Sequence, residues 1–165
     1  MDQRNQLSGT PSTLTTRDVS FYLESPHSFL IERFPQSSSI HFILDVVALG
    51  SFLDSCELFD VETGLWTKLT NISKRASSSP GAVAIQRGAS HRIYVFSENS
   101  CEFLDVEDQS QWTLLDAKMA SPRSKTCAVL LDYTTAVICG GLDDEALASC
   151  ESLDLTTHTF SPFPD

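Results

Sequence analysis

From about residue 37, short apolar segments rich in Val, Ile and aromatic residues alternate with polar segments rich in Ser, Asp, Asn and Gly. Apolar runs of this composition, bounded by turn-forming residues, are typical of β-strands. No window carries a helical period long enough for a stable helix. The pattern therefore predicts an all-β fold. The clearest strand segments are SIHFILDVVAL, GAVAIQR, RIYVFS, TCAVLLD and TAVICGG.

Residues 1–36 differ from the rest of the chain. Twelve of the first forty residues are Ser or Thr, and no hydrophobic period holds there. This composition predicts a partly disordered Ser/Thr-rich segment, with the lowest order in 1–18. The apolar residues of 20–34 suffice for one or two strands.

One phrase is repeated three times after residue 37. Cys-Glu-x-x-Asp begins at Cys56, Cys101 and Cys150, at spacings of 45 and 49 residues, and an aromatic residue follows each copy. Periods of this length indicate a repeat architecture. The repeats are placed at about 37–70, 71–116 and 117–165. The Asp of each copy (Asp60, Asp105, Asp154) is predicted to start a turn, and the aromatic residue (Trp66, Trp112, Phe160) to open the last strand.

The third copy resembles a kelch repeat. Pro122-Arg123 match the start of the family pattern, Gly140-Gly141 its double glycine, and Asp154 with Phe160 its turn and aromatic residue. The second copy keeps three of these positions (Arg75, Asp105, Trp112), but SENS replaces the double glycine. The first copy keeps two (Asp60, Trp66).

The resemblance implies a partial kelch-type β-propeller, with about three four-stranded antiparallel blades in an open ring. The repeated residues are then scaffold first. The aromatic residues fill the seams between blades, the alternative being a ligand platform. Arg75 and Arg123 pair with buried carbonyls or carboxylates, the alternative being peptide binding. Gly140 and Gly141 allow backbone angles, or occupy a space, that a side chain would forbid. Glu57, Glu102 and Glu151 either join blades or face solvent.

The net charge of −11 lies mainly in residues 41–165, which carry eight basic and eighteen acidic side chains. Such acidity excludes nucleic-acid backbones and anionic membranes as favoured partners, and a basic protein partner is compatible with it. The N-terminus lacks the apolar core of a signal peptide, and no apolar run is long enough to span a bilayer. A cytoplasmic protein is expected.

The five cysteines include no CxxC pair and no zinc-type spacing, which predicts reduced thiols in place of a metal site or disulfides, with Cys56, Cys101 and Cys150 buried as small apolar side chains. Cys127 and Cys139 are expected on adjacent strands, where pairing under oxidation is the alternative to free thiols. No cofactor is expected, and no nucleotide-binding, zinc-protease or serine-hydrolase motif is present.

The leading hypothesis is a non-enzymatic kelch-repeat module for protein–protein interaction, an adaptor or scaffold by family analogy. Its candidate binding loop is 141–149, with Asp143, Asp144 and Glu145; an ordinary solvated loop is the alternative. The loop RGASHR (87–92) is the basic counterpart. Because propellers close with about four to eight blades, three repeats also predict self-association or completion of the ring by another chain. The other hypotheses are a truncated structural fragment and a kelch-type enzyme subunit.

Overall fold

The computed structural model describes residues 28–33, 40–48, 51–52, 55–60, 63–73, 80–88, 90–108 and 111–164. These residues form strands and the segments that connect them, and no helix lies among them. Every pairing between these strands is antiparallel. The prediction of an all-β fold is therefore confirmed. Arg75 and residues 1–27, which include the expected disordered stretch, lie outside the described residues.

The first sheet has the strand order β1-β2-β4-β5, and β3 pairs with the end of β2. Its strands are β1 (Ser28–Arg33), β2 (Ile40–Ala48), β3 (Ser51–Phe52), β4 (Cys56–Asp60) and β5 (Leu65–Lys68). β1 comes from the segment 20–34, in which the sequence suggested one or two strands. Because β1 pairs with β2 along its length, the first sheet starts before residue 37.

The second and third sheets each have four strands that pair in the order in which they occur. The second sheet contains β6 (Gly81–Arg87), β7 (Ser90–Ser97), β8 (Ser100–Asp105) and β9 (Thr113–Leu114). The third contains β10 (Cys127–Leu130), β11 (Thr135–Cys139), β14 (Cys150–Asp154) and β15 (Thr159–Phe163). A separate hairpin, β12 (Leu142–Asp143) and β13 (Glu145–Ala146), interrupts the connection from β11 to β14.

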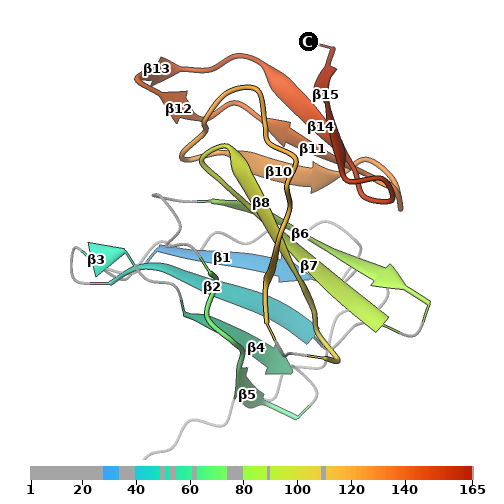
Figure 1. The fold of residues 1–165 in the computed structure, drawn as a ribbon. Helices are drawn as coiled ribbons and strands as arrows, with labels where there is room; N and C mark the ends of the chain where they lie inside the picture. Colours follow the sequence, from blue (N-terminus) through green and yellow to red (C-terminus); the bar gives the residue numbers. More distant parts are fainter. Residues whose placement is uncertain are drawn as a thin grey trace, which may run out of the picture.

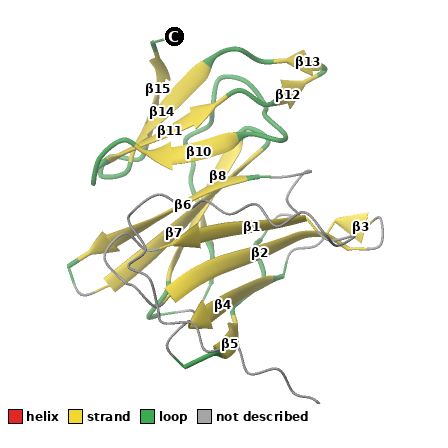
Figure 2. Ribbon diagram, turned by 180° about the vertical axis from the view of Figure 1, so that it is seen from behind, coloured by secondary structure: helices red, strands yellow, loops and turns green. Residues whose placement is uncertain are grey.

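The second sheet lies between the other two, as both ribbon views show (Figures 1 and 2). Its first strand, β6, contacts β1 on one side and β10 on the other. For this reason the residues of 81–85 are all buried, although a sheet with one solvated face would alternate buried and exposed positions.

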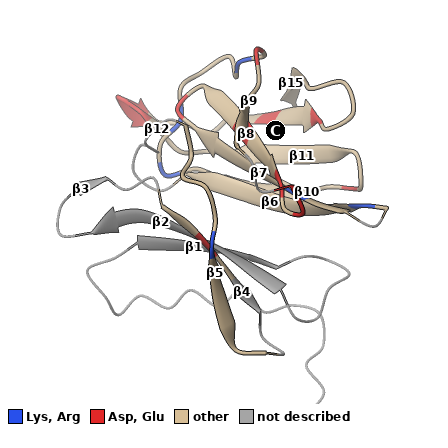
Figure 3. Ribbon diagram, turned by 60° about the horizontal axis from the view of Figure 1, so that its bottom comes forward, with Lys and Arg blue, Asp and Glu red and all other residues tan. Residues whose placement is uncertain are grey.

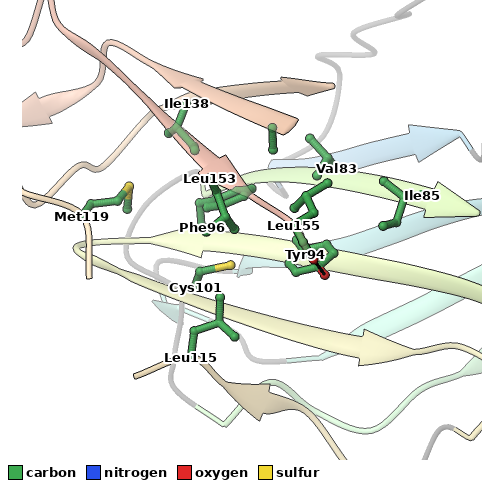
Figure 4. Packing of buried hydrophobic residues seen from close by; sticks show 11 residues of the cluster. Val83, Ile85, Tyr94, Phe96, Cys101, Leu115, Met119, Ile138, Leu153 and Leu155 are labelled. Atoms are coloured by element: carbon green, nitrogen blue, oxygen red, sulfur yellow. Dashed lines mark hydrogen bonds between the residues drawn. The ribbon is translucent and has the colours of Figure 1, made fainter. Parts of the chain in front are cut away.

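Two hydrophobic clusters fill the spaces between the sheets. The first joins the first and second sheets and contains Cys56, Leu69, Ile72, Ala82, Ala84, Ile93, Val95, Leu104, Val106 and Trp112. The second joins the second and third sheets and contains Val83, Ile85, Tyr94, Phe96, Cys101, Leu115, Met119, Ala136, Ile138, Leu153 and Leu155 (Figure 4). Each sheet therefore obtains its buried surface from its neighbours.

Within the described part of the chain, no helix is long and apolar enough to cross a membrane.

Candidate functional site

A groove of about 430 Å³ opens at one end of the second and third sheets. Three segments supply its walls: the turn between β7 and β8, the segment before β10, and the β12–β13 hairpin. The lining residues are Glu98, Asn99, Pro122, Arg123, Ser124, Leu142, Asp143 and Asp144. We call it the acidic groove, because three of these residues carry carboxylates. The structure thus places Asp143 and Asp144 from the predicted binding loop in the wall of a groove.

The β12–β13 hairpin presents its carboxylates to solvent. Asp143 lies opposite Glu145 in the hairpin, and Asp144 forms the turn between them with a positive φ of 49°. All three residues are exposed, and Figure 3 shows the red acidic positions beside the β12 label. The hairpin therefore holds three negative charges at the rim of the acidic groove.

Backbone hydrogen bonds fix the hairpin to the sheets. Ser124 and Leu142 exchange two of them, at 2.9 Å and 2.8 Å, and the Arg123 amide donates to the Glu98 carbonyl at 2.9 Å. The β12 strand is thus linked through the segment before β10 to the turn of the second sheet. The wall of the groove is built from connected backbone.

Arg123 forms the base beneath this wall and is only 1% exposed. Its Nη1 donates to the carbonyls of Gly140 at 2.9 Å and Ser149 at 2.7 Å. Its Nη2 donates to the Ser149 hydroxyl and to Glu151, each at 3.0 Å, and its Nε donates to Glu151 at 3.3 Å. These five bonds use the full donor capacity of a guanidinium. Arg123 therefore has the scaffold role that was expected, with no donor left for a peptide.

Glu151 connects this arginine to the segment that joins the second and third sheets. Its carboxylate accepts hydrogen bonds from the amides of Ala120 at 2.8 Å and Ser121 at 3.4 Å. Glu151 is 5% exposed. The same segment is bound to the second sheet, because the Met119 amide donates to the Asn99 carbonyl. Glu151 thus links two sheets and does not face solvent, which were the two alternatives for this residue.

Glu102 has the equivalent role one sheet earlier. Its carboxylate accepts from both the amide and the hydroxyl of Ser73, in the segment between the first and second sheets. It is also buried. In the second and third copies of the repeated phrase, the glutamate therefore binds the segment that leads into its own sheet.

The double glycine follows β11 and precedes Leu142, the first residue of β12. Gly140 and Gly141 have positive φ angles of 61° and 101°. A Cβ on Gly141 would lie 2.7 Å from the Ser124 carbonyl oxygen, whereas one on Gly140 would meet its nearest atom at 3.4 Å. At Gly141 both the backbone angle and the lack of space exclude a side chain, whereas at Gly140 only the backbone angle favours glycine.

The three repeated aromatic residues differ in burial. Trp112 is 6% exposed, packs in the first cluster and donates its indole N–H to the Thr70 carbonyl at 2.8 Å. Phe160 packs against the second cluster. Trp66, however, is 54% exposed, so the expectation that it fills a seam is wrong. Thr67 lies opposite Leu58, which packs against the first cluster. Because successive strand residues point to opposite faces of a sheet, Trp66 points away from the second sheet.

The repeated aspartates also differ. Asp154 accepts from the amides of Thr156 at 2.7 Å and Thr157 at 2.9 Å, which is the predicted side-chain-capped turn. The same hydrogen bonds, first that from Thr157, lower the pKa of Asp154. Asp105 also starts a turn, in which the Asp108 amide donates to the Asp105 carbonyl at 3.2 Å, but its carboxylate binds the Arg92 guanidinium at 2.6 Å and 2.8 Å. Asp60 ends β4 opposite Leu65.

The basic loop 87–92 lies at the other end of the sheets and is occupied by partners within the chain. His91 contacts Glu107 at 2.8 Å, and the guanidinium of Arg92 lies 4.2 Å from the centre of the Phe103 ring. Tyr94 and His158 meet beside this ring, 3.3 Å apart from Oη to Nε2. Burial, followed by the positive charges of Arg92 and Arg87, lowers the pKa of His158. This end is a packed polar cluster between two sheets.

The cysteines of the repeated phrase are buried in two copies and half-buried in the third. Cys56 and Cys101 are fully buried, as expected, and Cys150 reaches the surface. Burial raises the pKa of the Cys101 thiol, so it packs as a small apolar side chain. In the part of the chain that the structure describes, none of the five cysteines forms a disulfide, and no group of three or more His, Cys, Asp and Glu side chains could hold a metal ion.

Comparison with protein-family models and with curated proteins found no match to this chain.

The residues that sequence reasoning left undecided are the buried glutamates and their partners. Their signal was present in the repeats, because a charged residue directly after a buried cysteine recurs in each copy. The sequence did not show that Ser149 accepts a hydrogen bond from Arg123, or that Tyr94 and His158, 64 residues apart, are in contact.

Proposed function

We propose that this protein is a non-enzymatic interaction module of the kelch-type β-propeller kind, and that the acidic groove binds a basic segment of a partner protein. Two features support the propeller part of this proposal. The second and third sheets each pair their strands in chain order. Their first strands lie near one another, with β6 between β1 and β10, as expected when blades are arranged around an axis.

The observation that carries the binding proposal is the combination of an exposed acidic hairpin and a buried, fully bonded base. Asp143, Asp144 and Glu145 reach solvent. Arg123 beneath them already forms an ion pair with Glu151 and donates hydrogen bonds to two carbonyls. The groove therefore presents net negative charge on backbone held by hydrogen bonds. Lys- or Arg-containing segments are the partners that such a surface attracts, and the attraction weakens as salt is added.

Neutralising the hairpin tests this binding surface. The variant Asp143→Asn, Asp144→Asn and Glu145→Gln keeps the side-chain shapes, and Asn is well tolerated at the positive φ of residue 144. We expect wild-type protein to capture partners in a pulldown at low salt, and the variant to lose them. At a partly exposed interface, loss of three charges is expected to weaken binding by about tenfold or more, from roughly 0.5 kcal/mol or more for each charge.

The matched control neutralises two exposed acidic residues outside the groove, Asp108→Asn and Asp116→Asn. It should retain the captured partners. An unchanged set of partners with the hairpin variant, or an equal loss with the control, would remove the acidic groove as the binding surface.

A second contact surface is favoured by comparing equivalent positions of the sheets. Val83 and Tyr94 are register partners in the second sheet, and the third sheet covers them. The equivalent pair in the third sheet is Val129 and Val137. Val137 is buried, but Val129 is 56% exposed and Leu131, two residues farther along the chain, is 60% exposed. We propose that this outer face of the third sheet packs against a sheet of the same kind in a second copy of the chain.

Molecular mass in solution tests this contact. We expect the wild-type chain to form a discrete dimer, and the variant Leu131→Glu to shift toward the monomer because a charge would be buried in the contact. Thr156→Glu, an exposed position in the β14–β15 turn, serves as the control and should leave the mass unchanged. A wild-type monomer at concentrations of about 100 μM, where weak dimers with Kd in the micromolar range still form, would contradict the proposal.

A further inference from the structure

Three of the five cysteines form a row across the third sheet. Cys127 of β10 lies opposite Cys139 of β11, and Cys139 lies opposite Cys150 of β14. All three are at least partly exposed, in contrast to the fully buried Cys56 and Cys101. The row lies on the same outer face of the third sheet as Val129, so in the monomer, which the Leu131→Glu variant favours, it is accessible to reagents that cannot reach the other two thiols.

The hydrogen-bond pattern separates the two neighbouring pairs. Gly140 donates its amide to the Ser149 carbonyl at 3.1 Å, which makes 140 and 149 a hydrogen-bonded pair. Such pairs alternate along antiparallel strands, so Cys139 and Cys150 form a non-hydrogen-bonded pair, whose Cα atoms lie about 4.5 Å apart. Disulfides require Cα separations of about 4.4–6.8 Å, and side chains approach most closely at non-hydrogen-bonded positions.

Cys127 is placed less favourably. The Leu131 amide donates to the Thr135 carbonyl at 2.9 Å, which makes 131 and 135 a hydrogen-bonded pair. Cys127 and Cys139 are the pair four positions away on the same two strands. The alternation then makes this a hydrogen-bonded pair, with Cα atoms about 5.5 Å apart and side chains farther from each other. The strand register thus favours Cys150 over Cys127 as the partner of Cys139.

The sulfur environment agrees with this choice. Burial, followed by the hydrogen bond with the Cys150 thiol, raises the pKa of Cys139 to about 11. This agrees with the register, which places the two residues opposite each other. At neutral pH little thiolate is present on Cys139, so its oxidation should be slow and should accelerate as the pH rises.

The pair occurs in one sheet only. The cysteine of the repeated phrase lies opposite Leu44 in the first sheet and opposite Phe96 in the second. In the third sheet the equivalent position is Cys139. A large apolar side chain in two repeats is thus replaced by a second thiol in the repeat that carries the acidic hairpin.

We propose that Cys139 and Cys150 form a redox-active dithiol, which hydrogen peroxide converts into a cross-strand disulfide. One thiolate attacks a peroxide oxygen, forming a sulfenic acid and releasing hydroxide, which takes up a proton to give water. The sulfur of the second cysteine then attacks the sulfenic sulfur; its thiol proton and the departing hydroxyl leave as the second water. In sum, two thiols and one hydrogen peroxide give one disulfide and two waters.

The disulfide would close a loop that contains the β12–β13 hairpin, because residues 140–149 lie between the two cysteines. Oxidation would therefore restrain the connection that carries Asp143, Asp144 and Glu145. The redox site stands on strand register alone and does not depend on what the acidic groove binds.

Peptide mapping after peroxide treatment tests the proposal. The folded protein is treated with hydrogen peroxide, the remaining thiols are alkylated, and the digest is examined by mass spectrometry. We expect a Cys139–Cys150 linkage with the loss of two hydrogen atoms, alkylated Cys127, and reversal by a dithiol reductant. The linkage should form faster as the pH rises from 7 to 9, because the thiolate fraction grows.

Three variants provide the controls. Cys127→Ser should retain the linkage, whereas Cys139→Ser and Cys150→Ser should each lose it. Treatment of the wild-type chain in denaturant should give mixed linkages, because the strands no longer select a pair. A Cys127–Cys139 linkage in the folded protein, or alkylation of both Cys139 and Cys150 after peroxide, would overturn the proposal.

Discussion

Arg123→Met is expected to lower the free energy of unfolding by about 3–5 kcal/mol, since it removes one partner of a buried ion pair. The arginine is 1% exposed and Glu151 is 5% exposed. Without the guanidinium, the Glu151 charge stays buried, and the carbonyls of Gly140 and Ser149 lose the donor that they share. Unfolding in urea, followed by far-UV circular dichroism, measures the loss.

Lys118→Met is the matched control, because it removes a positive charge from an exposed position in the same connecting segment. Its effect should stay within about 0.5 kcal/mol. The double variant Arg123→Met with Glu151→Gln should be more stable than Arg123→Met alone, since the unpaired charge is gone. If Arg123→Met and Lys118→Met had equal effects, the assignment of Arg123 as the base of the groove would be refuted.

Trp112→Ala should destabilise the protein by about 3–5 kcal/mol, the range for removal of a buried aromatic side chain. The indole fills the first cluster between two sheets, and its N–H satisfies the Thr70 carbonyl. The change would therefore leave a cavity at the seam and remove a hydrogen bond. Urea unfolding again provides the measurement.

Trp66→Ala supplies the comparison within the same repeat position. Because Trp66 is 54% exposed, its removal should cost the monomer about 1 kcal/mol or less. Equal losses for the two tryptophans would contradict the difference in burial and would indicate that the first sheet is covered on both faces.

The local features of the repeat could be predicted from the sequence because they depend on neighbouring residues. The strand segments have β-branched and aromatic composition, and the Asp154 turn needs only a carboxylate and the two amides that follow it. Gly141 is required by its own positive φ angle. Each of these depends on the backbone within a single sheet.

The candidate site was located only in part. The acidic loop was selected from its composition, and the structure places Asp143 and Asp144 in a groove wall. The sequence did not reveal that Glu98 and Asn99, more than forty residues earlier, form the facing wall. It also placed Cys127 and Cys139 on neighbouring strands, as the structure confirms, but it did not show that Cys150 lies opposite Cys139 on the other side.

The sequence by itself determined that this chain forms short strands in three repeated units, because hydrophobic periodicity and turn residues act over a few positions. The tertiary structure alone decided which repeated residues are buried. Trp66 and Trp112 occupy the same place in their repeats, yet only Trp112 faces a neighbouring sheet. The physical reason is that burial depends on what lies across from a side chain, and that neighbour is brought there by packing between distant parts of the chain.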